Sequence, residues 1–221
     1  MMAICLLSGG MDSSTLAYLA KSEGYGIVAL HLNYGQRTER KERDCAKKIA
    51  QLLDAQDFVE VDVSYFTKFG ASSLTDRTID VEDYDSARAH MPNTYVPFRN
   101  SNLLSIATSF AEAKQADAIY MGVQSLDYSG YPDCRPQFMK AFQKVIDLGT
   151  KDTTHISLKT PFIKMTKTDI LKVGVKLGVP YEHTWSCYRN ETKACGTCGS
   201  CHYRREAFAA IGVIDPIPYE V

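Results

Sequence analysis

A glycine pair between an apolar strand and a helix, close to the amino terminus, most limits what this chain can fold into. Residues 6–14 read Leu-Leu-Ser-Gly-Gly-Met-Asp-Ser-Ser. Gly9 and Gly10 have no Cβ, so backbone N–H groups can approach a ligand there, and a helix starting near Asp12 adds unpaired N–H groups and a partial positive charge. The string predicts an anion-binding loop, the glycine loop, after the first strand. Its residues are Leu7, Ser8, Gly9, Gly10, Met11, Asp12, Ser13 and Ser14.

Asp12 is the acidic residue of this loop. Because a carboxylate repels phosphate, we expect Asp12 to hold a divalent metal ion, Mg²⁺, that bridges phosphate oxygens. The alternative is a plain strand-to-helix turn capped by Asp12 or Ser13. The strand before the glycines and the helix after them favour phosphate binding, although the loop is neither a Walker loop nor a Gly-x-Gly-x-x-Gly fingerprint.

The first two thirds of the chain alternate short apolar, β-branched runs with longer helical patterns. This alternation predicts a Rossmann-like α/β fold, an open parallel sheet of about five strands with helices on both faces. Residues 1–182 are expected to form the nucleotide-binding catalytic domain, and residues 183–221 a small C-terminal metal module. Strands are predicted at 3–7, 27–33, 58–62, 118–122 and 155–158, and helices at 12–22, 39–53, 100–114, 136–148 and 167–177.

Residues 70–97 break this rhythm with a polar, acidic stretch that we call the acidic segment. A connection of this length inside a compact domain is usually a functional loop or a lid. Composition narrows the partners: the 25 Lys plus Arg and 26 Asp plus Glu give a net charge of −1, without the basic excess that nucleic-acid or acidic-membrane binding draws on. No run approaches the roughly 20 apolar residues of a membrane span, and no signal peptide is recognisable. We expect a cytoplasmic protein that binds neither nucleic acid nor membrane.

Four of the seven cysteines lie between positions 187 and 201. Two consecutive Cys-x-x-Cys steps can point thiolates at one centre while the preceding cysteine completes a tetrahedron, which favours structural zinc. A [4Fe-4S] cluster, a redox dithiol and unmetallated packed cysteines are the alternatives. His202 could replace one of the metal ligands, but its neighbour Cys201 already supplies the fourth ligand. The expected ligands of one zinc ion per chain are Cys187, Cys195, Cys198 and Cys201.

The glycine loop resembles the pyrophosphatase loop of the ATP-pyrophosphatase superfamily. The resemblance implies that the loop grips the β and γ phosphates of ATP while a nucleophile attacks the α phosphorus, so that AMP and pyrophosphate form through an adenylated substrate. Lys164 and Lys167, at the start of a late predicted helix, could reach the polyphosphate; the alternative is an exposed pair on an amphipathic helix. The expected catalytic residues are Asp12, Ser13, Lys164 and Lys167.

Further strings identify a family within this superfamily. In their order along the chain they resemble the 7-cyano-7-deazaguanine synthase family, and the resemblance covers essentially the whole chain. Phe98 departs from it, since a small residue is expected there. The strings are Tyr-Gly-Gln-Arg at 34–37, Val-Pro-Phe-Arg-Asn at 96–100, Asp-Tyr-Ser-Gly-Tyr-Pro-Asp-Cys-Arg at 127–135, Ser-Cys-Tyr at 186–188 and Cys-Gly-Thr-Cys-Gly-Ser-Cys at 195–201.

These strings fall at the carboxyl ends of the predicted strands, where open parallel sheets bind ligands. The planar guanidinium groups of Arg37 and Arg99 suit phosphate or carboxylate, and we assign both to ATP; the alternative for each is an ion pair away from the site. Acids and tyrosines of the 127–135 string could bond and stack on a purine-like ring, although turn formation explains part of the string equally well. The expected substrate contacts are Asn100, Asp127, Tyr128, Tyr131, Asp133 and Arg135.

The family resemblance implies a ligase that converts 7-carboxy-7-deazaguanine and ammonia to the nitrile through an adenylated acid and an amide, in queuosine and archaeosine precursor biosynthesis. It also implies a homodimer. One alternative is a tRNA-thiolating enzyme, which would deliver sulfur through cysteine or an Fe-S centre; the near-neutral charge argues against it. The other is a non-catalytic zinc module that binds a partner through residues 183–206.

Overall fold

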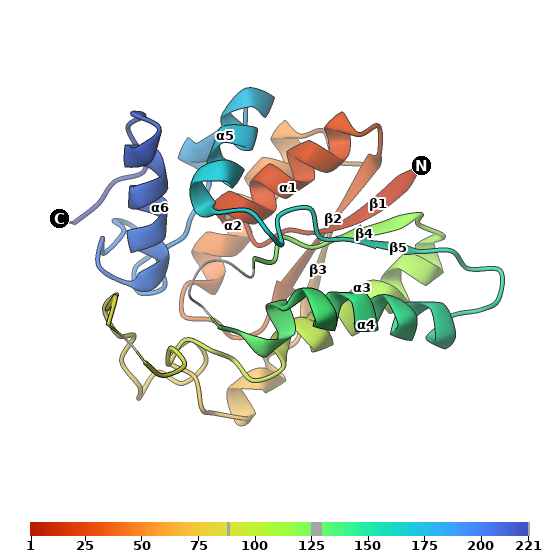
Figure 1. Cartoon of the computed structure of the whole chain (residues 1–221), viewed down its shortest axis with the longest axis horizontal. Coiled ribbons are helices and arrows are strands. Elements are labelled where there is room, and N and C mark those ends of the chain that lie inside the picture. Colours follow the sequence, from red (N-terminus) through yellow and green to blue (C-terminus); the bar gives the residue numbers. More distant parts are fainter. Residues whose placement is uncertain (88, 125–129, 221) are drawn as a thin grey trace.

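The computed structural model describes residues 1–87, 89–124 and 130–220. Its centre is one parallel sheet with strand order β3-β2-β1-β4-β5 (Figure 1). The register places Ile4 of the central strand beside Val28 on one side and Ile119 on the other. The strands are β1 (Met2–Leu6), β2 (Gly26–Asn33), β3 (Asp57–Asp62), β4 (Ala118–Tyr120) and β5 (Ser157–Lys159). The predicted five-stranded parallel sheet is therefore confirmed.

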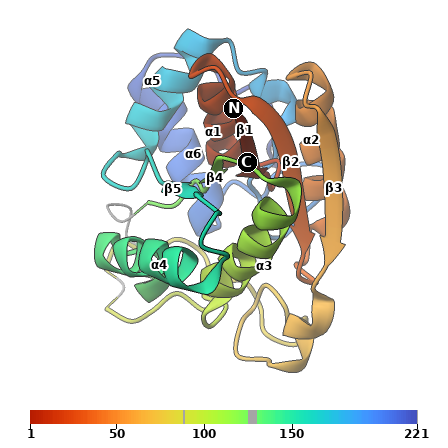
Figure 2. The same ribbon diagram turned by 90° about the vertical axis from the view of Figure 1, so that its right-hand side faces the viewer.

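Helices cover both faces of the sheet (Figure 2). The alternation of side chains along β1 explains how both faces are filled: Ile4 packs in a core with Leu104, whereas Ala3 and Cys5 pack in a second core with Leu16. On one face lie α1 (Met11–Ser22) and α2 (Glu39–Leu52), with α5 (Lys167–Leu177) against α1; on the other lie α3 (Arg99–Lys114) and α4 (Pro136–Gly149).

Local sequence signals set the ends of α3 and α5. The side chain of Thr166 accepts a hydrogen bond from the Asp169 N–H, and the Asp169 carboxylate accepts one from the Thr166 N–H, so a capping box starts α5. Before α3, Phe98 has a left-handed backbone with φ of 56°. Such a φ favours glycine, which explains why a small residue is expected at this position.

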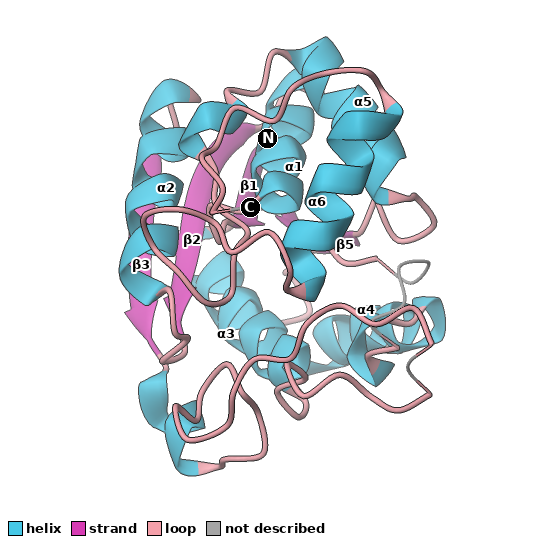
Figure 3. Cartoon of the chain, turned by 90° about the vertical axis from the view of Figure 1, so that its left-hand side faces the viewer, coloured by secondary structure: helices cyan, strands magenta, loops and turns pink. Residues whose placement is uncertain are grey.

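One helix, α6 (Gly199–Ala210), lies outside the elements predicted from the sequence. It packs against α5 and starts within the cysteine-rich string (Figure 3). Its buried positions are Cys201, Arg204, Ala207 and Phe208. Because a cysteine and an arginine occupy the buried stripe, the apolar periodicity that reveals a helix is absent from the sequence.

The acidic segment folds back onto α6 (Figure 1, yellow). The Tyr84 ring stacks on His202 of α6 with ring centroids 3.5 Å apart, and the Tyr84 N–H donates to the Thr197 carbonyl at 2.9 Å. The segment therefore forms one wall of the space between α6 and the carboxyl edge of the sheet. Within the described ranges, no helix is long and apolar enough to cross a membrane.

Candidate active site

The site lies at the carboxyl edge of the sheet, where the chain order reverses between β1 and β4. Open parallel sheets bind ligands at this switch point because the loops after the two strands diverge there. The glycine loop follows β1, and Gly122 follows β4. Both contribute to a pocket of about 280 Å³, which we call the glycine-loop pocket.

Gly9 makes the glycine loop possible. Its φ is +80°, and a Cβ placed on it would lie 2.5 Å from the Glu42 carbonyl oxygen and 2.7 Å from the Ala46 nitrogen of α2. The Ser8 and Ser13 hydroxyls lie 2.9 Å apart and brace the turn. The start of α1 therefore lines the pocket with the loop pressed directly against α2.

Replacing Gly9 with alanine is expected to lower the free energy of unfolding by about 2–4 kcal/mol, since the left-handed φ and the clash with α2 both add strain. Gly24→Ala is the matched control: its φ is +89°, but nothing lies within 4 Å of a Cβ there, so only the backbone cost of about 1 kcal/mol applies. Urea unfolding of both variants measures the difference. Equal losses would contradict the tight packing of the loop on α2.

Asp12 and Lys167 meet at the floor of the pocket. The Lys167 ammonium forms an ion pair with Asp12 Oδ2, while Asp12 Oδ1 is buried and has no hydrogen-bond partner among the described residues. A buried, unsatisfied carboxylate oxygen beside a phosphate-type loop fits a Mg²⁺ ligand. Lys164, by contrast, is exposed and is not among the residues that line this pocket.

Arg99 lines the same pocket from the first turn of α3. It donates from Nη1 to the Tyr34 hydroxyl at 2.8 Å, and its guanidinium carbon lies 4.9 Å from the centre of the Tyr34 ring. In the part of the chain that the structure describes, no carboxylate forms an ion pair with Arg99. Its charge is therefore available for an anion that enters the pocket.

A second cavity of about 720 Å³, the acidic-segment pocket, adjoins the first. Tyr84 of the acidic segment, Tyr131, Tyr188 and Tyr203 contribute to its walls. Tyr131 is held by a 2.9 Å hydrogen bond between its hydroxyl and that of Thr94. The lining residues common to both pockets, which we call the junction, are Asp12, Arg99, Asn100, Gly122, Val123, Lys167, Tyr188 and Ser200.

The other predicted substrate contacts differ in position: Asn100 lines the junction, whereas Asp133 and Arg135 line neither of these two pockets. Asn100 donates to both oxygens of buried Asp133, from its N–H at 2.8 Å and from Nδ2 at 3.2 Å, so this pair ties α3 to the loop before α4. Arg135 is exposed and precedes α4. Asp127 and Tyr128 lie outside the described residues.

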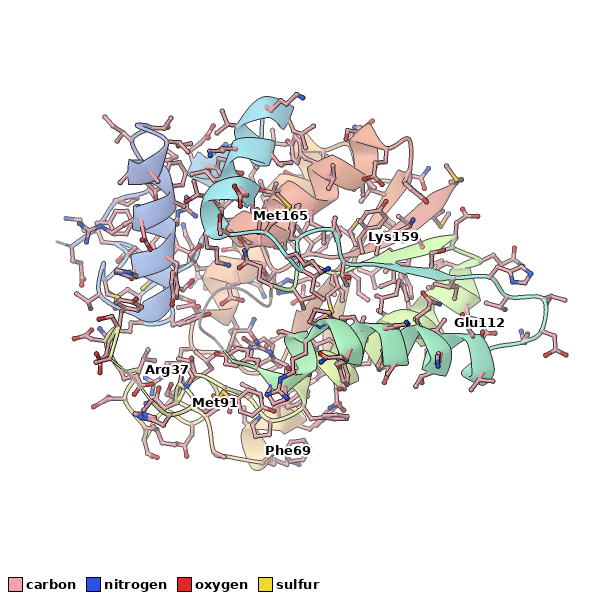
Figure 4. The ribbon with its side chains drawn as sticks, viewed as in Figure 1. Arg37, Phe69, Met91, Glu112, Lys159 and Met165 are labelled. Atoms are coloured by element: carbon pink, nitrogen blue, oxygen red, sulfur yellow. The ribbon has the colours of Figure 1, made fainter. Side chains whose placement is uncertain are left out.

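Arg37, whose binding of ATP stays a prediction, lies beside the acidic segment and is not among the lining residues of these two pockets (Figure 4). Its guanidinium donates to the carbonyls of Ser73, Asp76 and Ile79. These contacts hold the start of the acidic segment in place.

Several lining residues carried little signal in the sequence. Tyr34 and Tyr188 belong to the strings at 34–37 and 186–188, but nothing there distinguished them from packing residues. Glu42 lies on a helix whose charged residues suggest an ordinary solvated face. Tyr84 lies in the irregular acidic segment. Each becomes recognisable only when the fold brings its element to the pocket.

The four predicted zinc ligands come together next to this site. The sulfur atoms of Cys187, Cys195, Cys198 and Cys201 are buried and lie within 4.8 Å of one another. A zinc tetrahedron with Zn–S bonds of about 2.3 Å puts its sulfurs about 3.8 Å apart, and the Cys195 and Cys201 sulfurs are separated by 3.9 Å. Backbone N–H groups of residues 189, 190 and 195 point at the Cys187 sulfur from 3.3–3.4 Å, which suits a thiolate. The donor set fits a closed structural metal.

An open parallel sheet that carries a glycine loop at its switch point is an adenine nucleotide hydrolase-like α/β fold. The model of the family described as queuosine biosynthesis protein QueC matches residues 2–212, and the chain belongs to this family.

Individual relatives agree with this assignment. The chain is 69% identical over 220 residues to the 7-cyano-7-deazaguanine synthase of Methanosphaerula palustris, with 100% of both chains covered. It is 65% identical to that of Methanospirillum hungatei, with 99% of this chain and 100% of the relative covered. A solved structure of a 4-thiouridine synthetase in complex with RNA and bound ATP has a TM-score of 0.53 at 18% identity, covering 82% of this chain and 42% of that chain. This last likeness shows the fold alone.

Proposed function

We propose that the protein converts 7-carboxy-7-deazaguanine and ammonia to 7-cyano-7-deazaguanine, with ATP cleaved to AMP and pyrophosphate. The relatives that match its whole length carry the name of this synthase. The observation that carries the proposal is the junction, where Asp12, Lys167 and Arg99 lie between a pocket built on a glycine loop and a pocket walled by tyrosines.

The two pockets suit the two substrates. The glycine-loop pocket takes ATP, with its triphosphate on the N–H groups at the start of α1. The acidic-segment pocket takes the flat heterocycle between tyrosine rings. The substrate carboxylate then points to the junction, where Arg99 has no acidic partner among the described residues.

A carboxylate does not expel oxide, so a nitrile forms only when both oxygens become leaving groups. The carboxylate attacks the α phosphorus and pyrophosphate departs; ammonia then displaces AMP to give the amide. A second ATP adenylates the amide oxygen, and loss of AMP leaves the nitrile. Bound Mg²⁺, with Asp12 as its ligand, would neutralise phosphate charge. Lys167 and the loop N–H groups hold the departing pyrophosphate, and Arg99 offsets the charge of the attacking carboxylate.

The zinc has a structural role in this proposal. The segment that leads into the cysteine cluster is bonded to the glycine loop, since the Trp185 N–H donates to the Gly9 carbonyl at 2.9 Å. The cluster also starts α6, which brings Ser200 and Tyr203 to the pockets. A closed four-thiolate zinc has no open coordination position, so its contribution is to hold these walls. We further propose that ammonia is taken up free and that the protein is a homodimer, as the family resemblance implies.

Incubation of the zinc-loaded protein with 7-carboxy-7-deazaguanine, ammonium and Mg-ATP, followed by mass spectrometry, tests the proposal. The nitrile is expected, together with AMP and pyrophosphate. Recovery of unchanged acid from folded, zinc-loaded protein would contradict the substrate assignment. ATP turnover that requires tRNA would favour the thiolation alternative.

The ion pair at the junction gives a further expectation. Lys167→Ala is expected to lower the rate of pyrophosphate release by about 10²-fold or more, because the charge on the departing group loses a partner. Lys172→Ala removes an exposed lysine from the same helix and is expected to keep the rate within about twofold. Similar rates for the two variants would exclude Lys167 from the phosphate site.

A further inference from the structure

Glu42 is an acidic group in the glycine-loop pocket to which the mechanism above gives no role. It lies on the first turn of α2 and lines the pocket together with Ser8, Gly10 and Arg99. Its main chain lies directly behind the glycine loop, since a Cβ on Gly9 would be 2.5 Å from the Glu42 carbonyl oxygen. Glu42 therefore belongs to the helix turn that supports the loop we assign to ATP.

Two neutral donors orient the Glu42 carboxyl. The Thr38 hydroxyl donates to Oε1 at 2.8 Å, and Gln36 Nε2 donates to Oε2 at 3.1 Å. In the described structure no lysine, arginine or histidine forms an ion pair with Glu42. A carboxylate has about four acceptor positions, so it can accept further hydrogen bonds from the pocket side.

Burial raises the pKa of Glu42 to about 7, against the hydrogen bonds from Thr38 and Gln36 and the positive charge of Arg99, all of which lower it. Glu191, from the C-terminal loop, adds to the rise. The carboxylate form is therefore present above about pH 7 and is lost as the pH falls below it. The titratable and charged groups that line the pocket around Glu42 are Asp12, Tyr34, Arg99, Lys167, Tyr188 and Arg204, the last paired with Asp215, and Glu191 approaches from the C-terminal loop.

We infer that the Glu42 carboxylate binds ammonium in the glycine-loop pocket and takes one of its protons, so that ammonia is released beside the activated carboxyl group at the junction. The inference rests on the proposed function, which requires a nitrogen nucleophile there. Ammonium is the predominant form of ammonia at neutral pH and is not nucleophilic until it loses a proton. A carboxylate attracts this cation and repels a phosphate oxygen. Of the aromatic rings in the same pocket, those of Tyr34 and Trp185 already face Arg99 and Lys41, and the Tyr188 ring is of the kind that attracts cations.

Ammonium gives one proton to Glu42, and the freed nitrogen lone pair forms the C–N bond with the carbonyl carbon of the adenylated acid. The C–O bond to AMP then breaks, and the electron pair and a second nitrogen proton leave with the AMP phosphate. The products are the primary amide, AMP and protonated Glu42, which returns its proton to solvent.

Glu42→Gln separates this role from nucleotide binding because the two half-reactions can be measured apart. Without ammonium, ATP–pyrophosphate exchange that depends on 7-carboxy-7-deazaguanine reports adenylation, and Glu42→Gln is expected to keep it within about threefold. Amide formation at pH 7.5 and low ammonium is expected to fall by about 10²-fold, the lower range for loss of a general base. Glu39→Gln, on the same helix turn and outside both pockets of the described structure, is the control and is expected to retain both rates.

The pH profile at low ammonium adds a signature that a structural role would not give. The wild-type rate of amide formation is expected to rise up to about pH 7 and then level off. For Glu42→Gln the rate of amide formation is expected to rise about tenfold per pH unit through this range, since only free ammonia can then react. Equal loss of exchange and amide formation, a raised KM for ATP, or an unchanged pH profile would overturn the inference. Absence of exchange in the wild type would instead overturn the proposed function.

Discussion

Asp12→Asn is expected to abolish nearly all nitrile formation, lowering kcat by about 10³-fold, while the protein stays folded. Asparagine keeps the shape of the side chain, but it removes the charge that pairs with Lys167 and replaces one of the two carboxylate oxygens by an NH2 group, which cannot bind a metal ion. The phosphate site would then lose its acidic metal ligand, and Lys167 would lose its partner. Steady-state rates of AMP release, with thermal unfolding as a check on folding, measure the effect.

Asp44→Asn is a suitable control for the same change of charge. Asp44 lies on α2 with 57% of its side chain exposed, beside Arg43, and exposed pairs of this kind contribute little to stability. It is expected to leave the rate within about twofold of wild type. An Asp12→Asn protein that retains more than about a tenth of the wild-type kcat would show that the phosphate chemistry takes place without this carboxylate.

Removing the zinc that we propose at the four cysteines is expected to have the second large effect. Four-thiolate zinc contributes about 10–16 kcal/mol of binding free energy in small zinc-finger peptides, more than the whole stability of many domains. Cys198→Ala is therefore expected to lose the zinc, to expose residues beyond 183 to protease, and to lower nitrile formation about 100-fold or more. The loss reaches the active site because Trp185 is bonded to the glycine loop and α6 starts at the cluster.

Cys45 provides the matched control, because it is buried in the same apolar cluster as the four cysteines but is not one of the metal-binding set. Cys45→Ala is expected to keep one zinc per chain and its resistance to protease. Mass spectrometry measures the zinc content. Iron in place of zinc would favour the Fe-S alternative. Full activity in a metal-free Cys198→Ala protein would contradict the structural role of the metal.

Much of the fold could be predicted because its signals are local. The hydrophobic periodicity of a strand or helix can be recognised within about a dozen residues, and a glycine pair between the two indicates the loop directly. The sulfur cluster was also predictable, since the spacing of the cysteines limits where their thiols can point. Helix α6 was missed because Arg204 and Cys201 fill positions where apolar residues are expected.

The parts of the site that could not be predicted depend on long-range contacts. The sequence does not distinguish an arginine that binds phosphate from one that binds main-chain carbonyls. For Arg37, the carbonyl partners depend on the path of the acidic segment. Likewise, Glu42 becomes a pocket residue because α2 packs against Gly9. The roles of Lys164, Arg135 and the 127–128 pair, and the boundary between residues 182 and 183, remain predictions.

The central claim is that each oxygen of the substrate carboxylate leaves on an AMP molecule formed at the junction. Substrate labelled with ¹⁸O at both carboxylate oxygens, converted with unlabelled ATP in unlabelled water, tests it directly. Mass spectrometry is predicted to find one ¹⁸O in each AMP that is formed and none in the pyrophosphate. Label in pyrophosphate or in water, with unlabelled AMP, would contradict the account.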